Sequence, residues 1–284
     1  MFKSLILRKR LKLALGLSAL VVLLLGLWAF WLEPASLKVH VVSLQVPRWH
    51  VEHVDLKIAI LTDLHVGSPH TGLDKLHEVV ERTNRESPDL VVVLGDLVIN
   101  GVVGGEFVEP EPIAEELKKL RAPLGVIAVL GNHDWWTDGK RISEALQRAG
   151  LSVLENQARR VERSGKSFWV VGIADMWTRK PDIAGSLQQV EDDAPVILIT
   201  HNPDIFPEVP ARVSLTLAGH THGGQVNLPL VGRPIVPSKY EQRYAMGHVV
   251  EDGRHLFVSG GVGTSIIPVR FRVPPEIVIL TLRA

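Results

Sequence analysis

The chain contains no cysteine, which excludes disulfides, thiolate metal ligands and a cysteine nucleophile. It also has no excess of either charge, because 31 basic and 31 acidic residues give a formal net charge of zero. Only 22% of the residues are charged and 46% are hydrophobic, so an intrinsically disordered chain is excluded. A length of 284 residues suits one large domain or two small ones, with a core that needs no metal merely to fold.

The balanced net charge conceals a basic amino terminus. The first acidic residue is Glu33, and five basic residues precede it: Lys3, Arg8, Lys9, Arg10 and Lys12. The remaining 26 basic residues face 31 acidic ones, so the rest of the chain carries a net charge of −5. A mildly acidic body argues against nucleic acid as a partner.

Residues 13–32 form an uncharged run of 20 residues rich in Leu, Val and Ala. A helix of that length spans about 30 Å, which is the thickness of a bilayer core. The positive-inside rule places residues 1–12 in the cytoplasm as a basic tail and everything after Leu32 outside it. A cleaved signal peptide is the alternative, but bulky residues such as Trp28 and Trp31 occupy the expected cleavage region. We therefore expect a single-pass anchor.

Residues 37–284 are expected to form one α/β domain. Short apolar runs typical of buried strands alternate with helical stripes, which predicts crossover units and a layered sheet. The expected strands are 37–46, 56–61, 90–94, 126–130, 196–199 and 213–218. The last 40 residues are expected to form antiparallel strands around 249–250, 255–258 and 277–282.

Metal-ligating side chains directly follow five of these predicted strands. Ligands of open α/β sheets bind beyond the carboxyl ends of the strands, so these residues are expected to meet. The five segments contain Asp63 and His65, Asp96, Asn132 and His133, His201, and His220 and His222.

The residue types and their spacing point to first-row divalent metals. Imidazole and carboxylate ligands suit Mn, Fe or Zn, and the Asn132 amide adds a neutral oxygen. Asp63 and His65 are two residues apart, so an extended backbone would point them the same way, as it would His220 and His222. Seven ligand groups fit one ion poorly, and two ions that share Asp96 fit them better.

These blocks resemble the signature of the calcineurin-like metallophosphoesterases, over residues 56–225. The fuller GHTHGGQ sequence at 219–225 and the PPEI sequence at 274–277 are similar to a bacterial subgroup of membrane-linked phosphoesterases. The resemblance implies a β-sandwich flanked by helices, two divalent metal ions, and a location in the bacterial inner membrane. Some members are assigned to hydrolysis of UDP-2,3-diacylglucosamine in lipid A synthesis.

The resemblance also implies a role for each residue. Asp63, His65 and His222 would hold the first metal, whereas Asn132, His201 and His220 would hold the second. Asp96 would bridge both, and His133 would face the substrate as the catalytic residue. A metal-bridging hydroxide would then attack a phosphodiester or pyrophosphate bond.

Two other functions remain open from the sequence. One is a broad phosphodiesterase that acts on soluble nucleotides or cell-wall phosphates. The other is a non-catalytic, metal-binding membrane scaffold, against which His133 speaks because a scaffold has no use for that histidine. Trp135 and Trp136 follow the catalytic block and are expected to pack the loop rather than to contact substrate.

Overall fold

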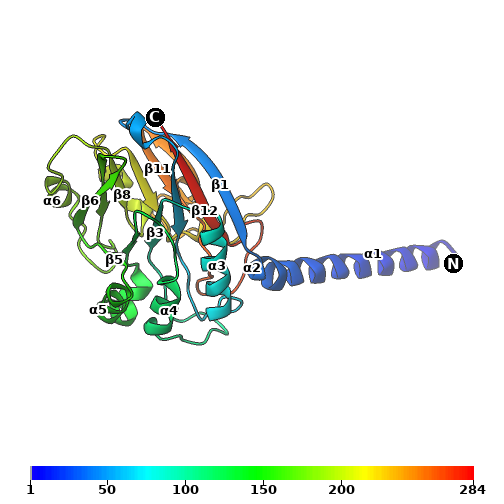
Figure 1. Cartoon of the computed structure of the whole chain (residues 1–284). Helices are drawn as coiled ribbons and strands as arrows, with labels where there is room; N and C mark the ends of the chain where they lie inside the picture. The colour runs from blue at the N-terminus through cyan, green and yellow to red at the C-terminus, as the bar shows by residue number, and fades with distance from the viewer. Residues whose placement is uncertain (1) are drawn as a thin grey trace.

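The computed structural model describes residues 2–284 of the chain. A long helix projects from a folded body made of two facing sheets and outer helices (Figure 1). The projecting helix is α1 (Phe2–Leu27), and it continues through a π-helical turn, η1 (Trp28–Leu32), into α2 (Glu33–Ala35). The stretch Ile6–Ala35 has a mean hydropathy of 2.5 and is long and apolar enough to cross a membrane.

The first sheet has six strands in the order β1-β12-β2-β3-β4-β5. Strands β2, β3, β4 and β5 run parallel, while β12 pairs antiparallel with β2 and parallel with β1. The bounds of these strands are β1 (Lys38–Gln45), β2 (Leu56–Leu61), β3 (Leu90–Leu94), β4 (Val126–Val129), β5 (Ser152–Val153) and β12 (Glu276–Arg283). The antiparallel arrangement expected at the carboxyl terminus therefore holds for one neighbour of β12 and fails for the other.

The second sheet also has six strands, in the order β10-β11-β9-β8-β7-β6. Strands β7, β8 and β9 are parallel, and β11 joins β9 in parallel and β10 in antiparallel pairing. The bounds are β6 (Gln157–Arg163), β7 (Lys166–Gly172), β8 (Val196–Ile199), β9 (Leu215–Ala218), β10 (Gly247–Glu251) and β11 (Arg254–Val258). The hairpin of β6 and β7 was not among the expected strands.

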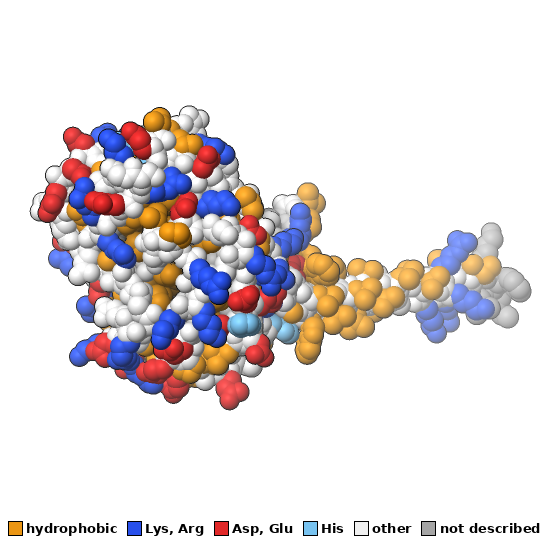
Figure 2. All heavy atoms as spheres, viewed as in Figure 1, with side chains coloured by type: hydrophobic (Ala, Val, Ile, Leu, Met, Phe, Trp, Pro, Cys, Tyr) orange, Lys and Arg blue, Asp and Glu red, His pale blue; other side chains and the backbone are white. Residues whose placement is uncertain are grey.

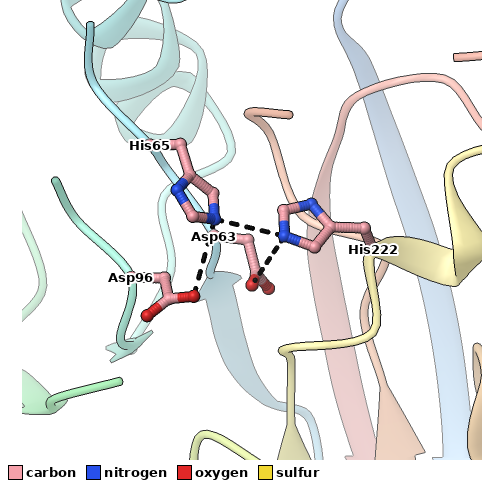
Figure 3. A group of neighbouring side chains, drawn as sticks. All are labelled: Asp63, His65, Asp96 and His222. Atoms are coloured by element: carbon pink, nitrogen blue, oxygen red, sulfur yellow. Dashed lines mark hydrogen bonds and ion pairs between the residues drawn. The ribbon is translucent and has the colours of Figure 1, made fainter. Parts of the chain in front are cut away.

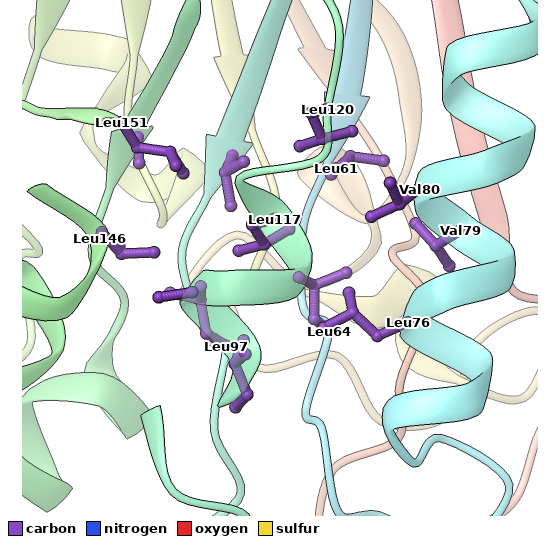
Figure 4. Close-up of a cluster of buried hydrophobic side chains, with 14 of the residues drawn as sticks. Leu61, Leu64, Leu76, Val79, Val80, Leu97, Leu117, Leu120, Leu146 and Leu151 are labelled. Atoms are coloured by element: carbon purple, nitrogen blue, oxygen red, sulfur yellow. The ribbon is translucent and has the colours of Figure 1, made fainter. Parts of the chain in front are cut away.

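Hydrophobic layers hold these sheets and helices together. One buried cluster, which includes Ile58, Leu90, Ile197 and Phe257, fills the space between the sheets. A second covers the outer face of the first sheet beneath α3, α4 and α5 (Figure 4). The bounds of the outer helices are α3 (Leu73–Arg85), α4 (Pro110–Leu117), α5 (Asn132–Arg148) and α6 (Ile183–Gln188). The expected α/β sandwich flanked by helices is confirmed.

The end of the membrane-type helix is docked onto this body. The Arg270 amide donates to the Ala29 carbonyl at 2.9 Å, and the Val273 amide donates to the Glu33 carboxylate at 2.7 Å. Glu33 is buried, and its other carboxylate oxygen accepts the Trp28 indole N–H. The helix therefore enters the domain through specific polar contacts to the segment around residue 270.

Candidate metal centre

All seven predicted metal-ligating residues lie just beyond the carboxyl ends of strands in the two sheets. Asp63 and His65 follow β2, Asp96 follows β3 and Asn132 follows β4 in the first sheet. His201 follows β8, and His220 and His222 follow β9 in the second. Because parallel strands of the two facing sheets end at the same side of the sandwich, these loops converge.

The side chains of Asp63, His65, Asp96 and His222 form one buried group (Figure 3). The Nε2 atoms of His65 and His222 lie 3.1 Å apart. His65 Nε2 also lies 3.5 Å from Asp96 Oδ2, and His222 Nε2 lies 3.4 Å from Asp63 Oδ1. Two imidazole lone pairs at this distance repel unless a proton or a cation lies between them, so this donor set fits a metal ion.

A second buried group contains Asp96, His201 and His220, and Asn132 lies against it. The Nε2 atom of His201 is 3.1 Å from His220 Nδ1, 3.1 Å from Asn132 Oδ1 and 3.2 Å from Asp96 Oδ2. The opposite nitrogen of His201 donates to the Leu94 carbonyl at 2.7 Å. That bond holds the ring with Nε2 free to act as a ligand.

Asp96 joins the two groups through a single atom. Its Oδ2 atom faces both His65 Nε2 and His201 Nε2, whereas its Oδ1 atom accepts the His133 amide at 2.9 Å. The carboxylate is thus fixed in orientation by the backbone on one side and offered to both groups on the other.

Burial and mutual charge set the protonation of the groups before a cation binds. Burial lowers the pKa of His65 to about 3, and it holds the pKa of His220 and of His222 well below the usual value. These three imidazoles are therefore neutral and able to act as ligands at neutral pH.

The pKa values of Asp63, Asp96 and His201 shift in different directions. Burial, aided by the nearby Asp96 charge, raises the pKa of Asp63 to about 6. Burial alone would favour the uncharged forms of His201 and Asp96, but the attraction between the two charges outweighs the effect of burial. That pair raises the pKa of His201 to about 10 and holds the pKa of Asp96 well below its usual range. The His201 proton thus occupies the position that a cation would take.

Backbone strain accompanies the cluster. Positive φ angles are uncommon for residues other than glycine, and they concentrate at functional sites. Five of the seven predicted ligands have them: Asp63, His65, Asp96, His220 and His222. The expectation that an extended backbone aligns each pair is therefore wrong, because the ligands leave the strands through tight left-handed turns.

Glycines allow the ligand loops to approach one another. A Cβ atom on Gly219 would lie 2.0 Å from Thr62 Oγ1 and 2.6 Å from Asp63 Oδ2. A Cβ atom on Gly131 would lie 2.3 Å from Asp96 Oδ1. Only glycine fits at these two positions, which directly precede His220 and Asn132, because a Cβ atom there would collide with the neighbouring ligand loop.

A cavity of about 290 Å³ opens beside the cluster. Asp96, Asn132, His133, His220 and His222 contribute polar lining, and the remaining lining is largely apolar. The apolar side chains are Trp136, Trp177, Ile235, Pro237 and Ile266. Burial lowers the pKa of His133, and its ring lies edge-on to that of Trp136 with centroids 5.0 Å apart.

These observations agree with a match to a known family. The sequence profile described as "Calcineurin-like phosphoesterase" matches residues 56–224, more than half of the chain. The chain belongs to the calcineurin-like phosphoesterases. It is accordingly a metal-dependent phosphoric ester hydrolase, which confirms the predicted enzyme class and replaces the scaffold alternative.

Bacterial relatives align with most of this phosphoesterase. It is 32% identical over 231 residues to "Uncharacterized metallophosphoesterase YkuE" of Bacillus subtilis, covering 80% of this chain and 79% of the relative. It is 31% identical over 270 residues to an uncharacterized metallophosphoesterase of Aquifex aeolicus, covering 93% and 98%. It is 32% identical over 234 residues to "Phosphodiesterase YaeI" of Escherichia coli, covering 80% and 82%.

The structure adds residues of this phosphoesterase that the sequence analysis missed. The buried Asp134 carboxylate accepts hydrogen bonds from the backbone amides of Asp96, Leu97 and Gly131 at 2.8–2.9 Å. It therefore holds the Asp96 loop against the Asn132 loop. Burial raises the pKa of Asp134 to about 7. Trp177 lies edge-on to His220 with ring centroids 4.3 Å apart. Trp177 follows β7, which was not among the expected strands, so no signal of the kind used for the five ligand segments pointed to it.

The two tryptophans after His133 behave differently. Trp135 is partly buried, and the Arg179 guanidinium lies 4.4 Å above its ring, as expected for packing. Trp136 is exposed and lines the cavity instead. The expectation that both residues pack the loop is therefore wrong for Trp136, because the helix turn places consecutive side chains on different faces.

Proposed function

We propose that this phosphoesterase is a dinuclear enzyme whose two groups each hold one divalent ion, Mn, Fe or Zn. Asp63, His65 and His222 would hold the first ion, and Asn132, His201 and His220 the second. The position of Asp96 Oδ2 between His65 and His201 is the observation that carries this proposal. Bound metal would supply positive charge for the phosphoryl oxygens and would acidify a water towards neutral pH.

The protein's own residues would then orient the substrate and complete the reaction. Asp96 is fixed by the His133 amide, so movement at His133 and movement at the metal cluster are linked. His133 lines the cavity without belonging to either ligand group, which supports its contact with a phosphate ester. It would stabilise the charge on the phosphoryl group or protonate the leaving oxygen, a role worth about 10²–10⁴-fold in rate.

The substrate that fits this cavity is an amphiphilic phosphodiester or pyrophosphate. The metal groups would hold the phosphoryl part, and Trp136, Trp177, Ile235 and Ile266 offer apolar surface to the rest. UDP-2,3-diacylglucosamine is one compound of this class. A broad phosphodiesterase acting on soluble nucleotides is the alternative, and it would use the same two tryptophans to stack a base.

We also propose the placement of this enzyme in the cell. Residues 1–12 would form a cytoplasmic tail, residues 13–32 the span in the bacterial inner membrane, and residues 37–284 a catalytic domain on the extracytoplasmic side. The apolar helix Ile6–Ala35 and the basic residues that precede its uncharged part, residues 13–32, support this arrangement.

The division of roles predicts different consequences for two substitutions. His133→Ala should cut turnover of bis-p-nitrophenyl phosphate with added Mn²⁺ by about 10²–10⁴-fold while metal content stays near that of the wild type. Asp96→Asn should lose both activity and metal, because it weakens the ligand shared by the two groups. Elemental analysis and the phosphodiesterase assay on both variants test this. Equal loss of metal in the two would contradict the assignment.

Substrate choice has its own test. Hydrolysis of an acylated phosphodiester in vesicles should exceed that of a nucleotide diester of the same bond type. A Trp177→Ala variant should lose more of its activity on the acylated phosphodiester than of its turnover of bis-p-nitrophenyl phosphate. Preference for the soluble diester would favour the broad phosphodiesterase.

A further inference from the structure

Six exposed aliphatic side chains lie in two loops beside the active-site cavity, and the proposed function accounts only for the two that line the cavity, Ile235 and Ile266. We call this set the apolar rim: Leu228, Leu230, Val231, Ile235, Ile266 and Ile267. Leu230 is fully exposed, and the side chains of Ile235 and Ile266 are exposed by 77% and 68%. A contiguous apolar surface of this kind marks a site for another molecule.

The two loops are joined to one another by backbone and side-chain hydrogen bonds. The Asn227 amide donates to the Phe271 carbonyl at 2.9 Å, and the Phe271 amide donates to the Gln225 carbonyl at 2.9 Å. The Gln225 side chain accepts the Ser265 amide at 2.7 Å and donates to the Ile267 carbonyl at 3.2 Å. The two loops that carry the rim are therefore held side by side.

The second of these loops, residues 262–275, is bonded to the end of the proposed membrane span. The Arg270 amide donates to the carbonyl of Ala29, which lies between Trp28 and Trp31. Exposed tryptophans at the end of a span mark the level of the membrane–water interface. The segment that carries Ile266 and Ile267 thus meets the anchor at interface depth.

The arrangement is visible in the overall views. The loop between β9 and β10 projects from the domain on the side from which α1 leaves it (Figure 1). In the space-filling view, hydrophobic atoms run along α1 up to the domain and recur, beside basic atoms, on the part that projects near the junction (Figure 2).

The charges of these loops complement an anionic lipid surface. Residues 226–240 and 262–275 contain no Asp or Glu, although the domain as a whole is mildly acidic. Lys239 and Arg272 are exposed in them. Aliphatic side chains interleaved with exposed basic groups are typical of segments that lie in the interface of a membrane.

We propose that the apolar rim is inserted in the bilayer that carries the anchor, so that the active-site cavity opens onto the lipid surface. Ile235 and Ile266 belong both to the rim and to the lining of the cavity, so an acyl chain could pass from the bilayer to the site without crossing water. The inference rests on the proposed membrane anchor, and it explains how an anchored hydrolase would reach an amphiphilic ester.

Because the chain has no cysteine, single labels test this directly in the full-length protein. Leu230→Cys reports on the rim, and Leu20→Cys reports on the span. Val51→Cys is the matched control, an aliphatic side chain exposed by 73% beyond the far end of β1. At about 3.3 Å per residue, the eight residues of β1 carry Val51 about 26 Å from the anchor end.

Each variant is labelled with a polarity-sensitive fluorophore and placed in vesicles of equal parts phosphatidylcholine and phosphatidylglycerol. We expect the label at position 230 to shift to the blue and to lose emission to nitroxide groups on the acyl chains, as the label at position 20 does. The label at position 51 should instead lose emission to aqueous iodide only.

The other outcomes overturn the inference in distinguishable ways. Acyl-chain quenching at position 20 but not at position 230 would leave the anchor in place and refute membrane insertion of the rim. No quenching at position 20 would refute the anchor itself, and the inference with it. Protection of position 230 from iodide that grows with protein concentration, without acyl-chain quenching, would show that a second copy of the chain covers the rim.

Discussion

At the scale of single residues, the metal cluster depends on groups that are not ligands. Asp134 is the clearest case, because one buried carboxylate accepts the amides of Asp96, Leu97 and Gly131. It thereby fixes the distance between the loops that carry Asp96 and Asn132. A change at Asp134 should therefore alter metal binding without removing any ligand.

Asp134→Ala should leave three buried amides without an acceptor. Each unsatisfied group costs about 1–3 kcal/mol, so the free energy of unfolding should fall by about 3 kcal/mol or more. Chemical unfolding of the full chain in detergent measures this, and metal content should fall in parallel. Asp193→Ala is the control, because its carboxylate is exposed and its loss should change stability by about 0.5 kcal/mol or less. Equal stability of the two variants would contradict the role of Asp134.

The left-handed backbone conformation of five predicted ligands is a second feature at the scale of single residues. Asp63, His65, Asp96, His220 and His222 each adopt a backbone conformation that disfavours ordinary side chains. The surrounding bonds hold them there, as when the His220 amide donates to the Asp63 carboxylate at 2.9 Å. The ligands thus maintain one another's strained positions through the protein backbone.

At the scale of elements, the loop after β11 supports the metal cluster from behind. The Gly263 amide donates to the Asp63 carbonyl at 2.6 Å, and the Val262 amide donates to the Thr62 carbonyl at 3.2 Å. The fully buried Arg270 guanidinium in turn donates to the carbonyls of Gly260, Gly261, Gly263 and Val273. Arg270 therefore connects the loop behind Asp63 to the segment that contacts the end of the apolar helix.

Replacement of Arg270 tests this support. Arg270→Lys keeps the charge but loses the planar set of donors, so several buried carbonyls should lose their partners. We expect a lower melting temperature and a lower metal content than in the wild type. Arg272→Lys is the control two residues away, where the side chain is exposed and neither quantity should change. If both variants bind metal equally well, Arg270 does not support the cluster.

The elements also show how much of the fold the sequence could predict. Continuous apolar runs such as 56–61 and 90–94 became strands buried on both faces. The helical spacing of Leu73, Leu76, Val79, Val80 and Thr83 predicts one face of a helix, and α3 buries all of them except Leu73, which is exposed. Strand β6, with the sequence QARRVER, was missed because it lies at a sheet edge and buries only Val161, whereas β7 was missed although residues 168–171 form a continuous buried apolar run. An edge strand needs few apolar residues, so it carries little signal.

The candidate site was more predictable than its geometry. A polar residue after a buried strand is visible in a sequence, and the seven predicted ligands do meet at one end of the sandwich. The direction of each side chain was not predictable, because it depends on tight turns such as those at Asp63 and His220. Asp134 and Arg270 act through backbone groups far away in sequence, and no local pattern reveals such partners.

At the scale of the whole molecule, the apolar helix and the phosphoesterase body form one connected unit. Glu33 and Ala29 at the end of the helix are bonded to the segment 270–273, and that segment reaches the metal loops through Arg270. The membrane would therefore orient the domain and not merely tether it. Orientation decides which substrates the enzyme meets.

The proposed topology is open to a direct test. Alkaline phosphatase, which works only outside the cytoplasm, should be active when fused after Ala284. A reporter that works only in the cytoplasm should be inactive at the same position. The basic residues before the span predict this result by the positive-inside rule. The reverse pattern would place the catalytic domain in the cytoplasm. If the catalytic domain lies outside the cytoplasm, substitution of Arg8, Lys9 and Arg10 by Gln should weaken the preference for that orientation.

Two ions are proposed to share Asp96, and manganese makes both the number of bound ions and their magnetic coupling measurable. Protein loaded with Mn²⁺ should bind about two ions per chain and give the paramagnetic resonance spectrum of a coupled pair about 3.5–4 Å apart. In Asp96→Asn, the coupled spectrum should disappear and the metal content should fall. One isolated ion per chain in the wild type, or a coupled pair that survives in Asp96→Asn, would contradict the account.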